Sequence, residues 1–208
     1  YVSRGGLKLE KALKEFNIKI EGKTCLDIGS STGGFTDVML QNGAKLVYAL
    51  DVGTNQLAWK IRSDERVVVM EQFNFRNALL SDFEQGRPAF TSIDVSFISL
   101  ELILPPLYEI LEEGGEVAAL IKPQFEAGRE QVGKNGIIRD PKVHKMTIEK
   151  VLAAATRLGF SIKGLTFSPI KGGAGNVEFL VHLLKDGKAE ISQQINIESV
   201  LQEESEEL

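Results

Sequence analysis

Thr24-Cys-Leu-Asp-Ile-Gly-Ser-Ser-Thr-Gly-Gly-Phe-Thr36 leads from an apolar strand through a turn of small residues into a helix. Gly29 and Gly33 let the backbone of this turn pass close to a ligand, and the helix directs its first N–H groups toward that ligand. The turn has neither the G-x-G-x-x-G spacing of dinucleotide sites nor the G-K-[ST] ending of phosphate loops. We therefore expect a ligand site of another kind. The alternative is a glycine-rich turn that serves only chain geometry.

Short apolar segments alternate with helical segments after this turn. Strands are predicted at 23–28, 45–50, 67–70, 89–93 and 116–121. Helices are predicted at 34–41, 55–62 and 98–111, the last one broken or kinked at Pro105 and Pro106, and an amphipathic helix over 6–16 precedes the first strand. The alternation predicts an α/β fold with a Rossmann-like, doubly wound parallel sheet covered by helices on both faces.

The last third of the chain departs from this alternation. Asp140 is a suitable N-cap, and Pro141 a suitable first residue, for a long helix that ends at Gly159. Two strands, 160–167 and 176–184, follow with no helical pattern between them. We expect these strands to pair as an antiparallel hairpin, whereas a dinucleotide-binding fold would continue with another crossover helix.

Polar side chains follow several of the predicted strands. Asp27, at the end of the first strand, suits a cationic ligand such as the amino-acid ammonium group of S-adenosylmethionine. Asp51 follows the second strand, where α/β nucleotide sites often place an acid that accepts from ribose hydroxyls. Its alternative role is a capping aspartate in a turn. Asn74 and Asp94 follow the third and fourth strands, so the predicted site lies at the carboxyl edge of the sheet.

Composition and charge exclude some classes of protein. The 208 residues are 43% hydrophobic and 25% charged, and no apolar run approaches the roughly 18 residues of a membrane-spanning helix. No signal-peptide core is evident, and the single Cys25 cannot form an internal disulfide, so we expect a cytoplasmic protein. The net charge of −5 lies in the tail after residue 184, which predicts a solvated or frayed acidic helix.

Six segments carry motifs of a known family. They are Val2–Lys8, Asp27–Thr36, Gln56–Trp59, Asp94–Leu100, Ile121–Glu126 and Gly175–Glu178. In this order they closely resemble the TlyA hemolysin family, which belongs to the FtsJ-like methyltransferases. The resemblance implies a class I methyltransferase fold, S-adenosylmethionine as cofactor, and 2′-O-methylation of ribosomal RNA. The expected cofactor-binding residues are Asp27, Gly29, Ser30, Ser31, Thr32, Gly33, Gly34, Phe35, Asp51, Val52, Asn74 and Asp94.

The family also implies a Lys-Asp-Lys-Glu catalytic set. The matching positions are Lys8, Asp94, Lys122 and Glu178, and all four are present. Family members usually carry an S4-type RNA-binding domain before the Ser-Arg-Gly segment, so we expect one in the full-length protein. The implied partners are ribosomal RNA or ribosomal subunits. The expected organisation is a linker and helix (1–22), a methyltransferase domain (23–185) and an acidic tail (186–208).

These residue types fit the implied chemistry. A ribose 2′-hydroxyl is a poor nucleophile until its proton is removed or shared, whereas a sulfonium methyl is already electrophilic. A lysine can remove the proton if burial and a neighbouring cation favour its neutral form. We predict that Lys122 is this activator, that Lys8 supplies the second cation, and that Asp94 and Glu178 orient both ammonium groups.

Other interpretations remain open at this point. They are a methyltransferase for a small molecule or protein, a dinucleotide oxidoreductase, which the glycine spacing disfavours, and a membrane-lysing hemolysin, for which no suitable segment is evident. No metal site is predicted, because His144 and His182 lack companions at ligand spacing. Phe97, Phe125 and Trp59 are predicted to pack in the core or loops, with base stacking as the alternative. Residues 125–139 are predicted to form a basic loop that faces RNA or acts as a mobile lid.

Overall fold

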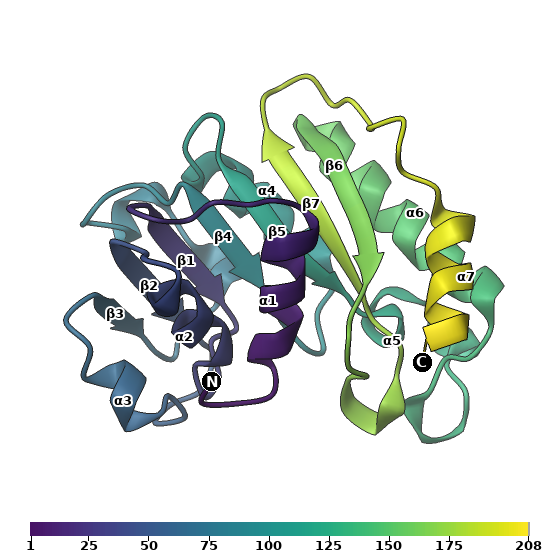
Figure 1. Ribbon diagram of the computed structural model, residues 1–208, viewed down its shortest axis with the longest axis horizontal. Helices are drawn as coiled ribbons and strands as arrows, with labels where there is room; N and C mark the ends of the chain where they lie inside the picture. The colour runs from purple at the N-terminus through teal and green to yellow at the C-terminus, as the bar shows by residue number, and fades with distance from the viewer. Residues whose placement is uncertain (208) are drawn as a thin grey trace.

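One seven-stranded sheet organises the molecule (Figure 1). The computed structural model describes residues 1–207, and its strand order is β3-β2-β1-β4-β5-β7-β6. The strands are β1 (Thr24–Ile28), β2 (Leu46–Leu50), β3 (Val67–Met70), β4 (Phe90–Ile93), β5 (Glu116–Ile121), β6 (Phe160–Phe167) and β7 (Phe179–Lys185). The first five run parallel, and β7 lies antiparallel between β5 and β6. The predicted doubly wound sheet and its terminal hairpin are both confirmed.

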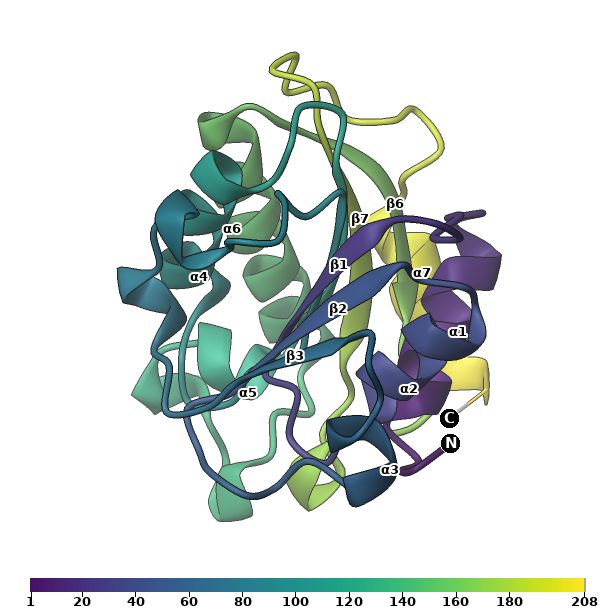
Figure 2. The ribbon, with the colours of Figure 1, turned by 90° about the vertical axis from the view of Figure 1, so that its left-hand side faces the viewer.

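Helices cover both faces of this sheet (Figure 2). They are α1 (Gly6–Glu15), α2 (Gly34–Gln41), α3 (Trp59–Arg62), α4 (Leu100–Ile110), α5 (Pro123–Glu126), α6 (Pro141–Leu158) and α7 (Ile197–Glu207). Buried side chains of α1 and α2 pack against one face, and those of α4 and α6 against the other. Single helical turns lie at Phe75–Asn77, Leu80–Asp82, Arg129–Gln131, Lys134–Gly136 and Gly173–Gly175.

Two predicted helices differ from those in the structure. The helix expected over 55–62 begins only at Trp59, because Asn55 has φ of 55° and Ala58 is extended. The helix around Pro105 and Pro106 is not broken but continues from Leu100 to Ile110. Its first turn is held from outside, because the Glu126 carboxylate accepts from the Leu100 N–H at 2.7 Å.

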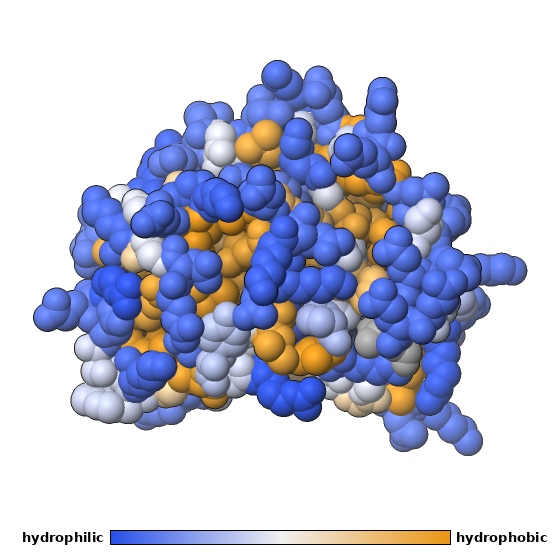
Figure 3. Space-filling model, in the orientation of Figure 1, coloured by the Kyte–Doolittle hydropathy of each residue, from blue (hydrophilic) through white to orange (hydrophobic). Residues whose placement is uncertain are grey.

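The first and last helices both pack on the sheet. Leu9 and Ala12 of α1 are fully buried, and α1 contacts β5 and β7, which places its Lys8 near the carboxyl end of β5. The acidic tail, predicted as a solvated or frayed helix, contains α7, which packs against α6 and β6 and buries Val200. Within residues 1–207, no helix is long and apolar enough to cross a membrane. On the face in Figure 3, apolar atoms form separate areas between polar side chains.

Candidate active site

A cavity of about 380 Å³ lies at the carboxyl ends of β1, β2 and β4. Six of the predicted cofactor-binding residues line it: Gly29, Ser31, Asp51, Val52, Asn74 and Asp94. Apolar side chains that were not predicted complete its wall, among them Phe73, Phe75, Ile98 and Ile103. We call this the cofactor cavity.

The glycine turn forms one wall of the cofactor cavity and fits closely against β4. Gly29 has φ of 87°, and a Cβ at this position would lie 2.0 Å from the Asp94 carbonyl oxygen. Gly33 has φ of 103°, and its Cβ would press against Leu57 and Ile61. Both positions therefore require glycine, for backbone conformation and for space.

Asp51 fastens this turn to the end of β2. Its Oδ2 accepts from the Ser31 N–H at 2.5 Å, and its Oδ1 accepts from the Gly53 N–H at 2.9 Å. The carboxylate keeps free lone pairs at the rim of the cavity, because each carboxylate oxygen can accept more than one bond. This geometry shows the role as a turn cap and leaves the carboxylate able to make the predicted ribose contact.

Asp27 lies beneath the turn rather than at the cavity wall. Its side chain is fully buried and accepts from Thr36 Oγ1 at 2.7 Å and from Ser92 Oγ at 3.4 Å. Burial raises the pKa of Asp27 to about 7, and the two hydroxyl bonds offset this rise only in part. The other predicted residues outside the wall are Ser30, Thr32, Gly33, Gly34 and Phe35.

Replacing Asp27 with asparagine is expected to flatten the pH dependence of stability. Between about pH 4 and pH 7 the native Asp27 carries a proton that the unfolded chain has released, so the free energy of unfolding falls as pH rises through this window. The neutral amide removes that loss, worth up to a few kcal/mol. Urea unfolding at pH 5 and pH 8 measures it, with the exposed Asp82→Asn as control. An unchanged pH dependence in Asp27→Asn would contradict this assignment.

A second cavity, of about 440 Å³, adjoins the first. Lys122, Gln124, Phe125, Asn176 and Glu178 line it, together with the loops around Gly136 and Gly173. Ser96 and Phe97 line both cavities, so the two spaces meet at the end of β4. We call the second space the acceptor cavity.

The four predicted catalytic residues form two ion pairs beside this junction. Lys122 Nζ lies 2.5 Å from Asp94 Oδ1 and 3.3 Å from Ser96 Oγ. Lys8 Nζ lies 2.8 Å from Glu178 Oε1, with both side chains almost completely buried. Asp94 reaches the cofactor cavity, whereas Lys122 and Glu178 reach the acceptor cavity. The Lys122–Asp94 pair therefore spans the boundary between the two cavities.

Neighbouring residues hold these pairs in place. Gln124 Nε2 donates to Glu178 Oε2 at 3.3 Å, and a Cβ on Gly172 would lie 1.8 Å from the same oxygen, so the Gly172 backbone closes over the carboxylate. Glu126 is also buried; it accepts from Ser99 Oγ and the Leu100 N–H, and burial raises the pKa of its carboxyl group. Glu126 thus joins the segment after Lys122 to the start of α4.

Two aromatic residues lie differently from their prediction. The expectation of core or loop packing is wrong for Phe97 and Trp59, whose side chains are 90% and 76% exposed. Phe97 has φ of 64°, which is unusual for a bulky residue, and its ring centroid lies 4.9 Å from that of Phe125. Cys25 is buried, and burial raises its pKa to about 12.

The arrangement can position two different ligands edge to edge. A carboxylate at the rim and apolar walls fit a nucleoside in the cofactor cavity, and the Lys122–Asp94 pair can orient and deprotonate a hydroxyl group beside it. Within residues 1–207, no cluster of three or more histidine, cysteine or acidic side chains could hold a metal ion.

Comparisons with known proteins agree with this geometry. The FtsJ-like methyltransferase family matches residues 1–185. The Bacillus subtilis protein YqxC, named provisionally as an rRNA methyltransferase, is 60% identical over 97% of this chain and 72% of its own length. The 16S/23S rRNA (cytidine-2′-O)-methyltransferase TlyA of Mycobacterium tuberculosis is 44% identical over 88% of this chain and 68% of its own length. The crystal structure of a provisionally named hemolysin from Lactococcus lactis is 91% identical, covers 99% of this chain and 98% of that one, and has a TM-score of 0.97.

Proposed function

Because this chain belongs to the FtsJ-like methyltransferase family, we propose that it transfers a methyl group from S-adenosylmethionine to a ribose 2′-hydroxyl of ribosomal RNA. The observation that carries the proposal is the Lys122–Asp94 pair at the junction of the cofactor and acceptor cavities. A ribosomal substrate also implies that the enzyme works in the cytoplasm.

The cofactor cavity has the groups that S-adenosylmethionine requires. Asp51 would accept from its ribose hydroxyls, the apolar wall formed by Val52, Phe73 and Ile98 would cover its adenine ring, and the glycine turn would pass beside its amino-acid end. Asp27 is too deeply buried to touch the ammonium group, so we assign it the support of the turn through Thr36 and Ser92.

The chain's own residues activate the acceptor. When bound, S-adenosylmethionine supplies an electrophilic sulfonium methyl group. We assign removal of the 2′-hydroxyl proton to Lys122 Nζ, and Asp94 balances the positive charge of the ammonium group. The oxygen–methyl bond forms as the methyl–sulfur bond breaks, and the Lys122 proton afterwards passes to solvent. Lys8 and Glu178 fix the adjoining wall of the acceptor cavity.

Phe97 is expected to stack on the target nucleobase. An exposed aromatic ring in a strained backbone conformation, between two ligand cavities, is typical of a residue held for ligand contact rather than for packing. Phe97→Ala should lower kcat/KM for RNA by roughly tenfold or more, because a base–aromatic stack contributes about 1–3 kcal/mol. Phe97→Tyr should keep most of the activity. Equal activity in the alanine variant would contradict the stacking role.

The test of the function is transfer of labelled methyl groups from S-adenosylmethionine to unmodified ribosomal subunits. We expect label in RNA, at linkages that resist alkali because the 2′-oxygen is blocked. A chain that binds the cofactor but labels no RNA, even with an S4-type RNA-binding domain attached, would overturn the ribosomal substrate.

A further inference from the structure

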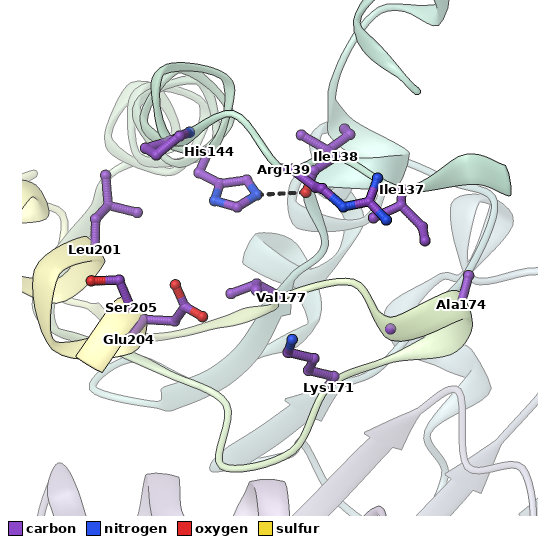
Figure 4. Close-up of a pocket in the computed structure, with 12 residues that line it drawn as sticks. Ile137, Ile138, Arg139, His144, Lys171, Ala174, Val177, Leu201, Glu204 and Ser205 are labelled. Carbon is purple, nitrogen blue, oxygen red and sulfur yellow. Dashed lines mark hydrogen bonds between the residues drawn. The ribbon is translucent and has the colours of Figure 1, made fainter. Parts of the chain in front are cut away.

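A third cavity, of about 530 Å³, lies beside the acceptor cavity (Figure 4). Its wall includes Ile137, Arg139, Lys171, Val177, Leu201 and Glu204. Ala174 belongs to both cavities, so the loop over residues 171–175 separates the two spaces. We call this third space the flanking cavity.

The two basic side chains of the flanking cavity, Arg139 and Lys171, make no ion pair that stabilises the described part of the fold. Among residues 1–207, neither Arg139 nor Lys171 makes an ion pair with an acidic side chain. Figure 4 shows the Lys171 amine pointing into the space and the Glu204 carboxylate facing it from α7. Both basic side chains are exposed, so solvent or a ligand supplies their partners.

The backbone that carries Arg139 is held firmly. The buried Asn176 amide donates to the Gly136 carbonyl at 2.8 Å and accepts from the Ile138 N–H at 3.0 Å. The buried His144 ring contacts the Ile138 carbonyl at 3.0 Å. Asn176 therefore ties the loop before Arg139 to the loop after Lys171, so the backbone segments that carry the two cations are held together.

We propose that the flanking cavity binds the RNA nucleotide next to the target nucleotide. Its phosphate lies between Arg139 and Lys171, and its sugar and base lie against Ile137, Val177 and Leu201. Two unpaired cations beside an apolar wall fit a nucleotide better than a free phosphate, which would leave the apolar wall without a partner. The inference rests on the proposed function, because the neighbouring cavity must hold the target ribose.

The test compares binding of a fluorescent single-stranded oligoribonucleotide by the whole chain and its variants. Arg139→Ala with Lys171→Ala should weaken binding about tenfold and reduce the slope of log K against log salt by about 1.4, from two contacts of roughly 0.7 each. The control Arg157→Ala with Lys163→Ala removes the same charge from exposed positions at or near the opposite end of β6, and should change binding less than twofold. Glu204→Gln should strengthen binding by about threefold, because it removes a carboxylate that faces the phosphate.

Several outcomes would overturn the flanking cavity. If the two double variants weaken RNA binding equally, the effect comes from overall charge and not from the flanking cavity. If inorganic phosphate displaces the oligoribonucleotide at an equal concentration, the cavity is a site for a simple anion and not for a nucleotide. Methyl transfer measured in parallel separates the two proposals. Transfer to RNA with an unchanged RNA KM in Arg139→Ala/Lys171→Ala overturns the cavity alone. If RNA binding requires Arg139 and Lys171 but the unaltered chain transfers no methyl group to RNA, the result overturns the ribosomal function alone.

Discussion

Lys122→Ala should reduce methyl transfer by about a thousandfold, because proton transfer by a positioned side chain contributes roughly 10²–10⁴-fold. Lys122 is the residue that faces the acceptor cavity and pairs with Asp94 of the cofactor cavity. Its removal leaves the glycine turn and Asp51 in place. Affinity for S-adenosylmethionine should therefore change less than twofold.

The measurements for Lys122 are single-turnover transfer and cofactor binding by calorimetry. Lys45→Ala is the matched control, because Lys45 is an exposed lysine before β2, at the opposite edge of the sheet. A loss of cofactor affinity as large as the loss of rate would show that Lys122 supports the cofactor site instead. Near-normal transfer would remove it from the mechanism.

Glu178→Ala should both unfold the protein more easily and abolish transfer. Lys8 and Glu178 are 9% and 1% exposed, so removing the carboxylate leaves a buried ammonium group without a partner, at a cost of about 3–5 kcal/mol. Replacing both residues, as Lys8→Met with Glu178→Leu, should recover most of this stability, because no charge is then left buried. Activity should stay lost in the double variant.

Urea unfolding and methyl transfer on the same samples test this pair. The exposed pair Lys145–Glu198 is the control, and Glu198→Ala should leave both properties nearly unchanged. An active double variant would show that the Lys8–Glu178 pair only stabilises the fold. Unchanged stability in Glu178→Ala would contradict the buried geometry.

The sheet could be predicted from local sequence because each strand is short, apolar and followed by a turn or helix signal. The hairpin followed from the lack of any helical pattern between 160–167 and the last strand. The start of α3 could not be predicted, because Asn55 and Ala58 take non-helical conformations imposed by the turn that packs on Thr32 and Glu71. The first turn of α4 is held by Glu126, a residue distant in sequence.

The site shows the same division. Asp51, Asn74 and Asp94 could be placed at one edge from topology alone, since parallel strands share their carboxyl ends. The burial of Asp27 could not be predicted, because a side chain at the end of a strand can point either toward the ligand or beneath the loop. The exposure of Phe97 depends on its positive φ, for which an aromatic residue gives no signal in the sequence. The unassigned cations of the flanking cavity come from loops more than thirty residues apart.

The most direct test of the central claim is nucleoside analysis of ribosomal RNA after incubation with S-adenosylmethionine and either the unaltered chain or Lys122→Ala. We predict a 2′-O-methylated nucleoside with the unaltered chain and none with the variant. A methyl group on a base, or equal product from both proteins, would contradict the assignment of Lys122 and the ribose hydroxyl as the reacting pair.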